Sequence, residues 1–69
     1  MRGFFEIMPD VIRIGRVVYR ASQPDVFIRC DYDNSRLVSY KMDGTERVEL
    51  GEWTPNSSDM FIESWAFLG

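Results

Sequence analysis

Hydrophobic and polar positions alternate most regularly in the middle of the chain. Within residues 25–32, every second side chain is apolar, small or aromatic, and these side chains share one face of a strand: Val26, Ile28, Cys30, Tyr32. The pattern predicts a half-buried strand. Cys30 is the only cysteine, and its phase predicts a small core residue with a buried, inert thiol. The sequence Asp33-Asn34-Ser35 predicts the turn that follows.

An apolar run at residues 11–20 predicts the first strand, preceded by an extended segment at residues 4–7. Strict alternation fails in this run, because its apolar side chains change parity at Gly15. A glycine inside a strand often marks a β-bulge. The extra residue of a bulge switches the alternation, so that the apolar side chains before and after it lie on the same face of the sheet. We therefore expect a bulge at Gly15–Arg16 that places four residues on one face: Ile12, Ile14, Val17, Tyr19.

Two further segments, residues 36–42 and 45–50, flank Asp43-Gly44, which is a hairpin signal. A two-residue loop would place the apolar side chains of the two strands on opposite faces. A three-residue loop over residues 42–44 instead pairs Val38 with Val48 and lets Leu50 join their face. Since a slip of one residue turns a whole strand over, we predict the three-residue loop, with Gly44 at positive φ.

The segment at residues 59–68 fits two structures. Its aromatic character favours a closing strand, but Ser58 is also a suitable helix cap, and a helix would present an apolar stripe on one side: Phe61, Ile62, Trp65, Leu68. With the strand, residues 1–69 form a single mainly β domain, either a small antiparallel meander or a five-stranded SH3-like or OB-like barrel. With the helix, the alternative is a four-stranded antiparallel sheet and one C-terminal helix.

The composition excludes several kinds of chemistry. The chain has 69 residues, no histidine and one cysteine, so an internal disulfide is impossible and a Cys/His zinc site cannot be built. No segment has the run of about 20 apolar residues that crosses a bilayer, and nothing in the sequence indicates export. We expect a protein of the reducing cytoplasm, without cofactor, metal or membrane attachment.

No catalytic motif is present in the sequence. Serine and cysteine nucleophiles both commonly depend on an imidazole base, and the chain has none. Asp31, Asp33 and Ser35 resemble the start of an EF-hand loop, but Arg36 replaces the glycine at its sixth position and Met42 the glutamate at its twelfth. We therefore expect a protein that is not an enzyme.

The first functional hypothesis is a protein-binding module, such as an adaptor, a subunit or an inhibitor, or a self-associating chain. Aromatic residues, methionine and arginine are enriched at protein interfaces, and aromatics make up 14% of this small chain. Four in the acidic C-terminal part are candidate anchors: Trp53, Phe61, Trp65, Phe67. The alternative is that all four complete the core. Small size and a net charge of −3 lead to the narrower hypothesis of a phage or mobile-element accessory protein that blocks a host enzyme.

The second hypothesis is single-stranded nucleic-acid binding through the N-terminal sheet. Small β domains bind single strands with basic side chains and stacking aromatics on one face. The candidates for such a face are Arg13, Arg16, Arg20, Phe27 and Arg29. A pI near 4.7 and the scarcity of lysine speak against it, because surfaces that bind phosphate are usually strongly basic. Nucleic acid is therefore the less favoured partner.

Overall fold

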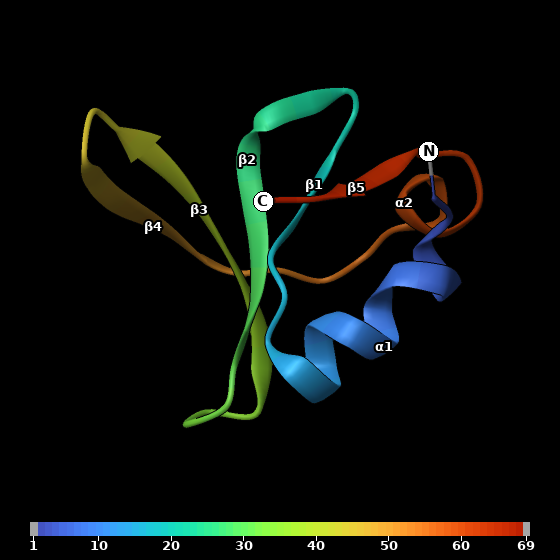
Figure 1. Ribbon diagram of the computed structural model, residues 1–69, viewed down its shortest axis with the longest axis horizontal. Helices are drawn as coiled ribbons and strands as arrows, with labels where there is room; N and C mark the ends of the chain where they lie inside the picture. The colour runs from blue at the N-terminus through green and yellow to red at the C-terminus, as the bar shows by residue number, and fades with distance from the viewer. Residues whose placement is uncertain (1, 69) are drawn as a thin grey trace.

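The computed structural model describes residues 2–68 and shows a mainly β protein with two helices (Figure 1). In chain order, the elements are α1 (Phe4–Ile14), β1 (Val18–Arg20), β2 (Gln23–Asp31), β3 (Arg36–Asp43), β4 (Glu46–Glu52), α2 (Ser57–Phe61) and β5 (Trp65–Phe67). All strand pairings are antiparallel, and the strand order is β4-β3-β2-β1-β5. The predicted antiparallel, mainly β fold is confirmed. Over the described residues, the sheet is open and does not close into a barrel.

The N-terminal segment is where the sequence prediction is wrong. Residues 4–14 form α1 instead of an extended segment and a strand, and the first strand is confined to Val18–Arg20. Gly15 does not form a bulge. It has φ 73°, ends α1 in the left-handed conformation and donates its backbone N–H to the carbonyl of Asp10. This left-handed helix end favours glycine, because a Cβ is disfavoured there.

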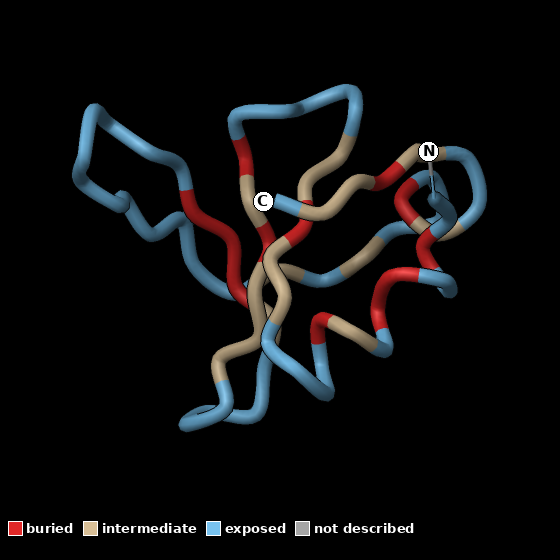
Figure 2. Tube along the Cα trace, viewed as in Figure 1, coloured by how far each residue is buried: buried red, intermediate tan, exposed pale blue. Residues whose placement is uncertain are grey.

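The core lies between α1 and one face of the sheet, which we call the inner face. The apolar side chains of α1 recur at helical spacing and are buried: Phe4, Ile7, Met8, Val11. They pack on inner-face residues of β1, β2 and β5: Val18, Val26, Ile28, Trp65. Pro9 lies inside α1 on its exposed side, where it removes one backbone hydrogen bond without entering the core. Figure 2 shows buried segments on α1, β1, β2, β3, α2 and β5, whereas the β3–β4 hairpin loop and the turn after β2 are exposed.

The central strand is close to the prediction. Val26 and Ile28 are buried on the inner face of β2, and the four residues that follow Asp31 form a turn. Cys30 points to the same face but is only half-buried, and Tyr32 is exposed. The predicted burial of Cys30 is wrong, because α1 does not fully cover the inner face near its C-terminal end.

The register predicted for the β3–β4 hairpin is also wrong. The hairpin closes through a two-residue loop, Gly44-Thr45, with Asp43 opposite Glu46. Gly44 has the predicted positive φ, 64°, and occupies the first position of the loop, as in a type II′ turn. Val48 therefore lies opposite Lys41, not opposite Val38.

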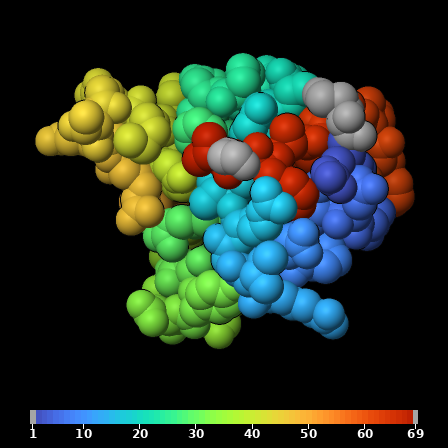
Figure 3. Space-filling model, in the orientation of Figure 1, coloured from blue at the N-terminus to red at the C-terminus, as the bar shows by residue number. Residues whose placement is uncertain are grey.

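A bulge further along shifts the hairpin register again and places Val38 opposite Glu52. The physical reason for the error is that β4 carries no buried residue. Every residue of β4 is exposed, so matching apolar residues across the hairpin stabilises no particular register. Figure 3 shows the hairpin projecting from the body of the molecule.

The C-terminal segment contains parts of both predicted structures. Residues 57–61 form the short helix α2, and residues 65–67 form the closing strand β5 beside β1. The cap of α2 is Asn56, not Ser58. At its other edge, β5 makes an isolated bridge with Arg2, through the bonds Arg2 N–H to Trp65 O (3.0 Å) and Trp65 N–H to Arg2 O (2.8 Å).

Candidate functional site

The buried carboxylate of Asp59 holds the short helix α2 in place, because one of its oxygens caps the helix and the other binds strand β1. The Asp59 side chain accepts the backbone N–H of Asn56 at 3.1 Å, and the Asn56 side chain accepts the backbone N–H of Asp59 at 2.8 Å. This reciprocal pair is a capping box. The other oxygen of Asp59 accepts Arg20 Nη1 of β1 at 2.9 Å, and both side chains are largely buried. Asp59 therefore fixes α2 to strand β1 of the sheet.

Trp65 completes this attachment. Its indole Nε1 donates to the carbonyl of Asp59 at 2.9 Å, and its ring is fully buried. The ring of Phe4 lies 6.0 Å from that of Trp65, and the ring of Phe5 lies 5.2 Å from that of Phe4. A chain of packed aromatic rings therefore runs from the core of the sheet to the surface of α1.

The surface end of that chain is an exposed apolar cluster, which we call the aromatic patch and define as Phe5, Phe61 and Ile62. Phe5 is 64% exposed, Phe61 74% and Ile62 80%. The rings of Phe5 on α1 and Phe61 on α2 lie 6.0 Å apart. The patch therefore joins two helices that are fixed beneath it, and it presents large apolar side chains to solvent.

Of the four predicted anchors, only Phe61 belongs to the aromatic patch. Trp65 is in the core, and Trp53 is half-buried against it, 5.8 Å from the Trp65 ring. Phe67 is half-buried, and the guanidinium groups of Arg2 and Arg16 lie 5.3 and 3.6 Å from its ring centre. Trp53, Trp65 and Phe67 therefore lie in the core or at its margin, as in the alternative in which the aromatic residues complete the core.

Sequence reasoning missed Phe5 and Ile62 as surface residues. If residues 4–14 are interpreted as a helix, Phe5 falls outside the apolar stripe of Phe4, Ile7, Met8 and Val11. Its position in the sequence then predicts that it is exposed. In the helix alternative for residues 59–68, Ile62 is part of the predicted apolar stripe. It instead ends the short α2, where its backbone N–H bonds to the carbonyl of Ser58.

The predicted arginine face is not assembled. Arg13 is exposed in the last turn of α1, Arg16 stacks on Phe67, and Arg20 pairs with Asp59 beneath the surface. Only Phe27 and Arg29 lie together, on the face of β2 opposite to α1, which we call the outer face. Arg29 is paired there with Glu49 at 3.2 Å.

The outer face carries a row of three aromatic rings. Tyr19, Phe27 and Tyr40 are register partners on β1, β2 and β3. Ring centres lie 6.0 Å apart for the first two and 5.4 Å for the last two. The Arg47 guanidinium lies 5.4 Å from the Tyr40 ring and also pairs with Glu49 at 3.3 Å. The basic groups of this face are thus matched by a carboxylate.

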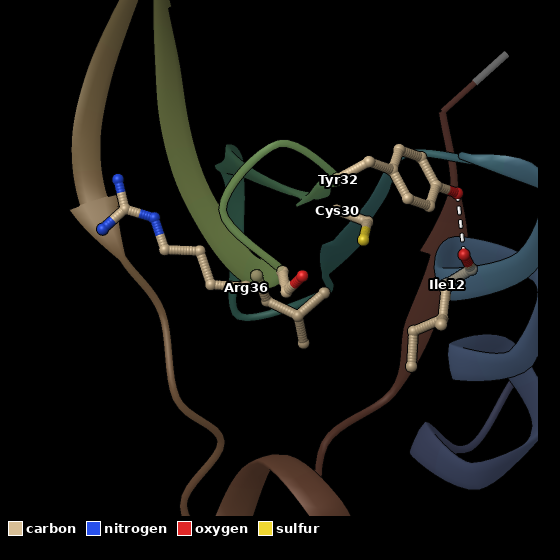
Figure 4. A pocket seen from close by; sticks show the side chains of 6 residues that line it. Ile12, Cys30, Tyr32 and Arg36 are labelled. Carbon is tan, nitrogen blue, oxygen red and sulfur yellow. Dashed lines mark hydrogen bonds between the residues drawn. The ribbon is translucent and has the colours of Figure 1, made fainter.

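A largely apolar cavity of about 360 Å³ opens between the end of α1 and the turn after β2 (Figure 4). It is lined by Ile12, Cys30, Tyr32, Ser35, Arg36 and Leu37. The Tyr32 hydroxyl donates to the carbonyl of Ile12 at 2.7 Å, which ties the turn to the helix. The Arg36 guanidinium does not point into the cavity and instead lies near Asp31 and Glu52, at 3.6 and 3.7 Å.

Within residues 2–68, no group of three or more histidine, cysteine or acidic side chains is placed to hold a metal ion. None of the helices in that range is long and apolar enough to span a membrane. Comparison of the sequence and structure with protein-family models, with curated proteins and with solved structures gave no match.

Proposed function

We propose that this chain is a small non-catalytic module that binds another protein through the aromatic patch. The observation that carries the proposal is the contact between the rings of Phe5 and Phe61, 6.0 Å apart, with Ile62 next to Phe61 in sequence and all three side chains more than half exposed. Single exposed apolar side chains are ordinary, but adjacent large ones on a fixed platform are typical of interaction surfaces. Burial of such rings by a partner removes apolar area from water, which is the main favourable term in association.

The way the aromatic patch is supported adds to the proposal. Phe61 belongs to a helix of five residues, too short to be stable alone. The capping box, the Arg20–Asp59 pair and the Trp65 indole bond hold it against the sheet. An anchor that is held in place before binding loses less conformational entropy when it docks. This support favours a binding role for Phe61 over a purely structural one.

Single-stranded nucleic acid is the second candidate, and the row of Tyr19, Phe27 and Tyr40 is the observation that favours it. Stacked bases need exposed ring faces and free positive charge. Here Tyr40 is buried, and Glu49 contacts both Arg29 and Arg47. A protein partner therefore remains the proposal, and nucleic acid is an outcome that its test separates.

The test is capture from nuclease-treated extract of the native cell with three forms of the chain. The wild-type chain and Leu50→Ala should retain the same partner, whereas Phe61→Ala should lose it. Leu50 is a matched control, because it is also an exposed apolar residue but lies on the hairpin. With the purified partner, Phe61→Ala should weaken binding roughly 30-fold, as loss of an interface anchor does.

Two results would overturn the proposal. One is a partner retained equally by Phe61→Ala and by the wild-type chain. The other is binding to DNA or RNA, with steep salt dependence, and no protein captured after nuclease treatment. Far-UV circular dichroism should show that both variants are folded, since the two side chains are exposed.

A further inference from the structure

The two edges of the sheet differ in how their backbones are paired. The outer edge of β5 is bridged by Arg2 through two backbone hydrogen bonds. At the opposite edge, β4 is paired with β3 on one side only. All seven of its residues, from Glu46 to Glu52, are exposed. An exposed edge strand presents free N–H and C=O groups that can pair with another strand.

The hairpin loop determines which groups of β4 point outward. Asp43 and Glu46 flank the two-residue loop, so they form a hydrogen-bonded pair. Hydrogen-bonded and non-hydrogen-bonded pairs alternate along an antiparallel ladder. Met42 with Arg47 and Tyr40 with Glu49 are therefore non-hydrogen-bonded pairs. It follows that Arg47 and Glu49 direct their backbone N–H and C=O groups away from β3, toward the open edge.

We propose that β4 is a self-pairing edge, through which two copies of this chain join their sheets in antiparallel register centred on Val48. In this register, Arg47 of each copy forms backbone hydrogen bonds with Glu49 of the other. The two Val48 side chains become neighbours. Each interface then has four backbone hydrogen bonds and two opposite-charge cross-strand pairs.

Charge complementarity selects the second copy as the occupant. Glu49 already lies between Arg29 and Arg47 of its own chain, at 3.2 and 3.3 Å. A second copy places another arginine opposite each Glu49, so positive and negative side chains alternate across the joint. Opposite charges facing each other across strands stabilise a sheet, and like charges destabilise it.

The neighbouring registers are unfavourable. A shift of one residue brings outward-pointing positions opposite inward-pointing ones, and the backbone bonds are lost. A shift of two residues places either Arg47 opposite Arg47 or Glu49 opposite Glu49. The bulge between Glu49 and Gly51, where Gly51 has φ 113°, ends the regular stretch on the other side. The register centred on Val48 is thus the one in which the backbone hydrogen bonds form and opposite charges face each other.

The test measures the dimer dissociation constant by sedimentation velocity, at low salt and up to millimolar chain concentration. The wild-type chain should dimerise. Arg47→Glu and Glu49→Arg, each alone, should weaken the dimer roughly tenfold or more, because both charge pairs become repulsive. An equimolar mixture of these two variants should form a heterodimer, since every introduced charge then faces its opposite.

Asp33→Arg is the control for net charge. Asp33 is exposed in the turn at the other end of β3, and its substitution changes charge as Glu49→Arg does. It should leave the dissociation constant unchanged. The proposal is overturned if the wild-type chain stays monomeric, or if the mixture associates no better than its separate components. These residues lie outside the aromatic patch, so the result does not depend on the proposed function.

Discussion

The two ends of the sheet stabilise the protein in different ways. At the β1–β2–β5 end, side chains of α1 cover the inner face and bury Val18, Ile28 and Trp65 completely. At the β4 end, no residue of the strand is buried, and the charged side chains of β4 form ion pairs on the surface. Burial therefore specifies the body of the molecule. The hairpin is specified by its turn and its backbone ladder, which tolerate changes of side chain.

The largest expected contrast is in the free energy of unfolding. Trp65→Ala removes the largest fully buried side chain and should cost about 3–5 kcal/mol, which is enough to unfold a small domain. Ile28→Val, a milder change in the same core, should cost about 1 kcal/mol. Leu50→Ala on β4 should change stability by less than about 0.5 kcal/mol. Urea unfolding followed by circular dichroism measures all three, and equal effects of Ile28→Val and Leu50→Ala would refute the contrast.

The next contrast compares two ion pairs. Asp59→Ala leaves Arg20 largely buried without its carboxylate and removes one of the two hydrogen bonds of the capping box of α2. The expected cost is about 3 kcal/mol or more. Glu52→Ala removes one of the two carboxylates near Arg36, at a pair that is about half exposed, and should cost less than about 1 kcal/mol. Thermal unfolding of both variants decides the matter, and a cost for Glu52→Ala as large as that for Asp59→Ala would contradict the prediction.

The hairpin should be more sensitive in its loop than in its strand. Gly44→Ala places a Cβ at φ 64°, and this should cost about 1 kcal/mol. Thr45→Ala, at the adjacent loop position, should cost less than about 0.5 kcal/mol. Cross-strand nuclear Overhauser effects should show Lys41 opposite Val48 in the wild-type chain, whereas contacts between Val38 and Val48 would restore the register predicted from the sequence.

The smallest effect concerns the turn after β2. The hydrogen bond from Asn34 Nδ2, at 2.8 Å, holds the pKa of Asp31 below its ordinary value, with help from Arg29 and Arg36. Ionised Asp31 therefore stabilises the fold above its unfolded-state pKa, and this contribution is lost as the pH falls through the folded-state pKa. Asn34→Ala should raise that pKa, which a carboxyl NMR titration can follow. An unchanged Asp31 titration in Asn34→Ala would show that the hydrogen bond is not the main cause.

The parts of the fold that the sequence predicted are those where burial and pattern agree. Alternation located β2 because Val26 and Ile28 are buried at every second position. α1 was missed although Phe4, Ile7, Met8 and Val11 have helical spacing, because the apolar run at residues 11–20 was interpreted as a strand with a bulge at Gly15. Pro9 is tolerated on the exposed side of the helix, and Gly15 marks its end. Both residues have local roles that only the packing reveals.

The candidate site was predicted only in part for a related reason. Phe61 was named as an anchor, but the sequence treated all four C-terminal aromatics alike. Their separation into core and surface depends on how α2 packs on the sheet, and Asp59 holds α2 there through its contact with Arg20 on a distant strand. Hydrogen bonds between segments far apart in the chain produce no periodic pattern of apolar and polar residues in the sequence.

The bridge between Arg2 and Trp65 also bears on the time course of folding. It joins residues near the two ends of the described chain, whereas β2, β3 and β4 are connected by short turns. Local contacts form quickly, and closure of a long loop must wait for enough interactions to offset its entropy. We expect the β2–β4 meander to form before β5 docks. Pulse-labelled amide hydrogen exchange during refolding should then protect Phe27 and Tyr40, which pair with each other across β2 and β3, earlier than Trp65.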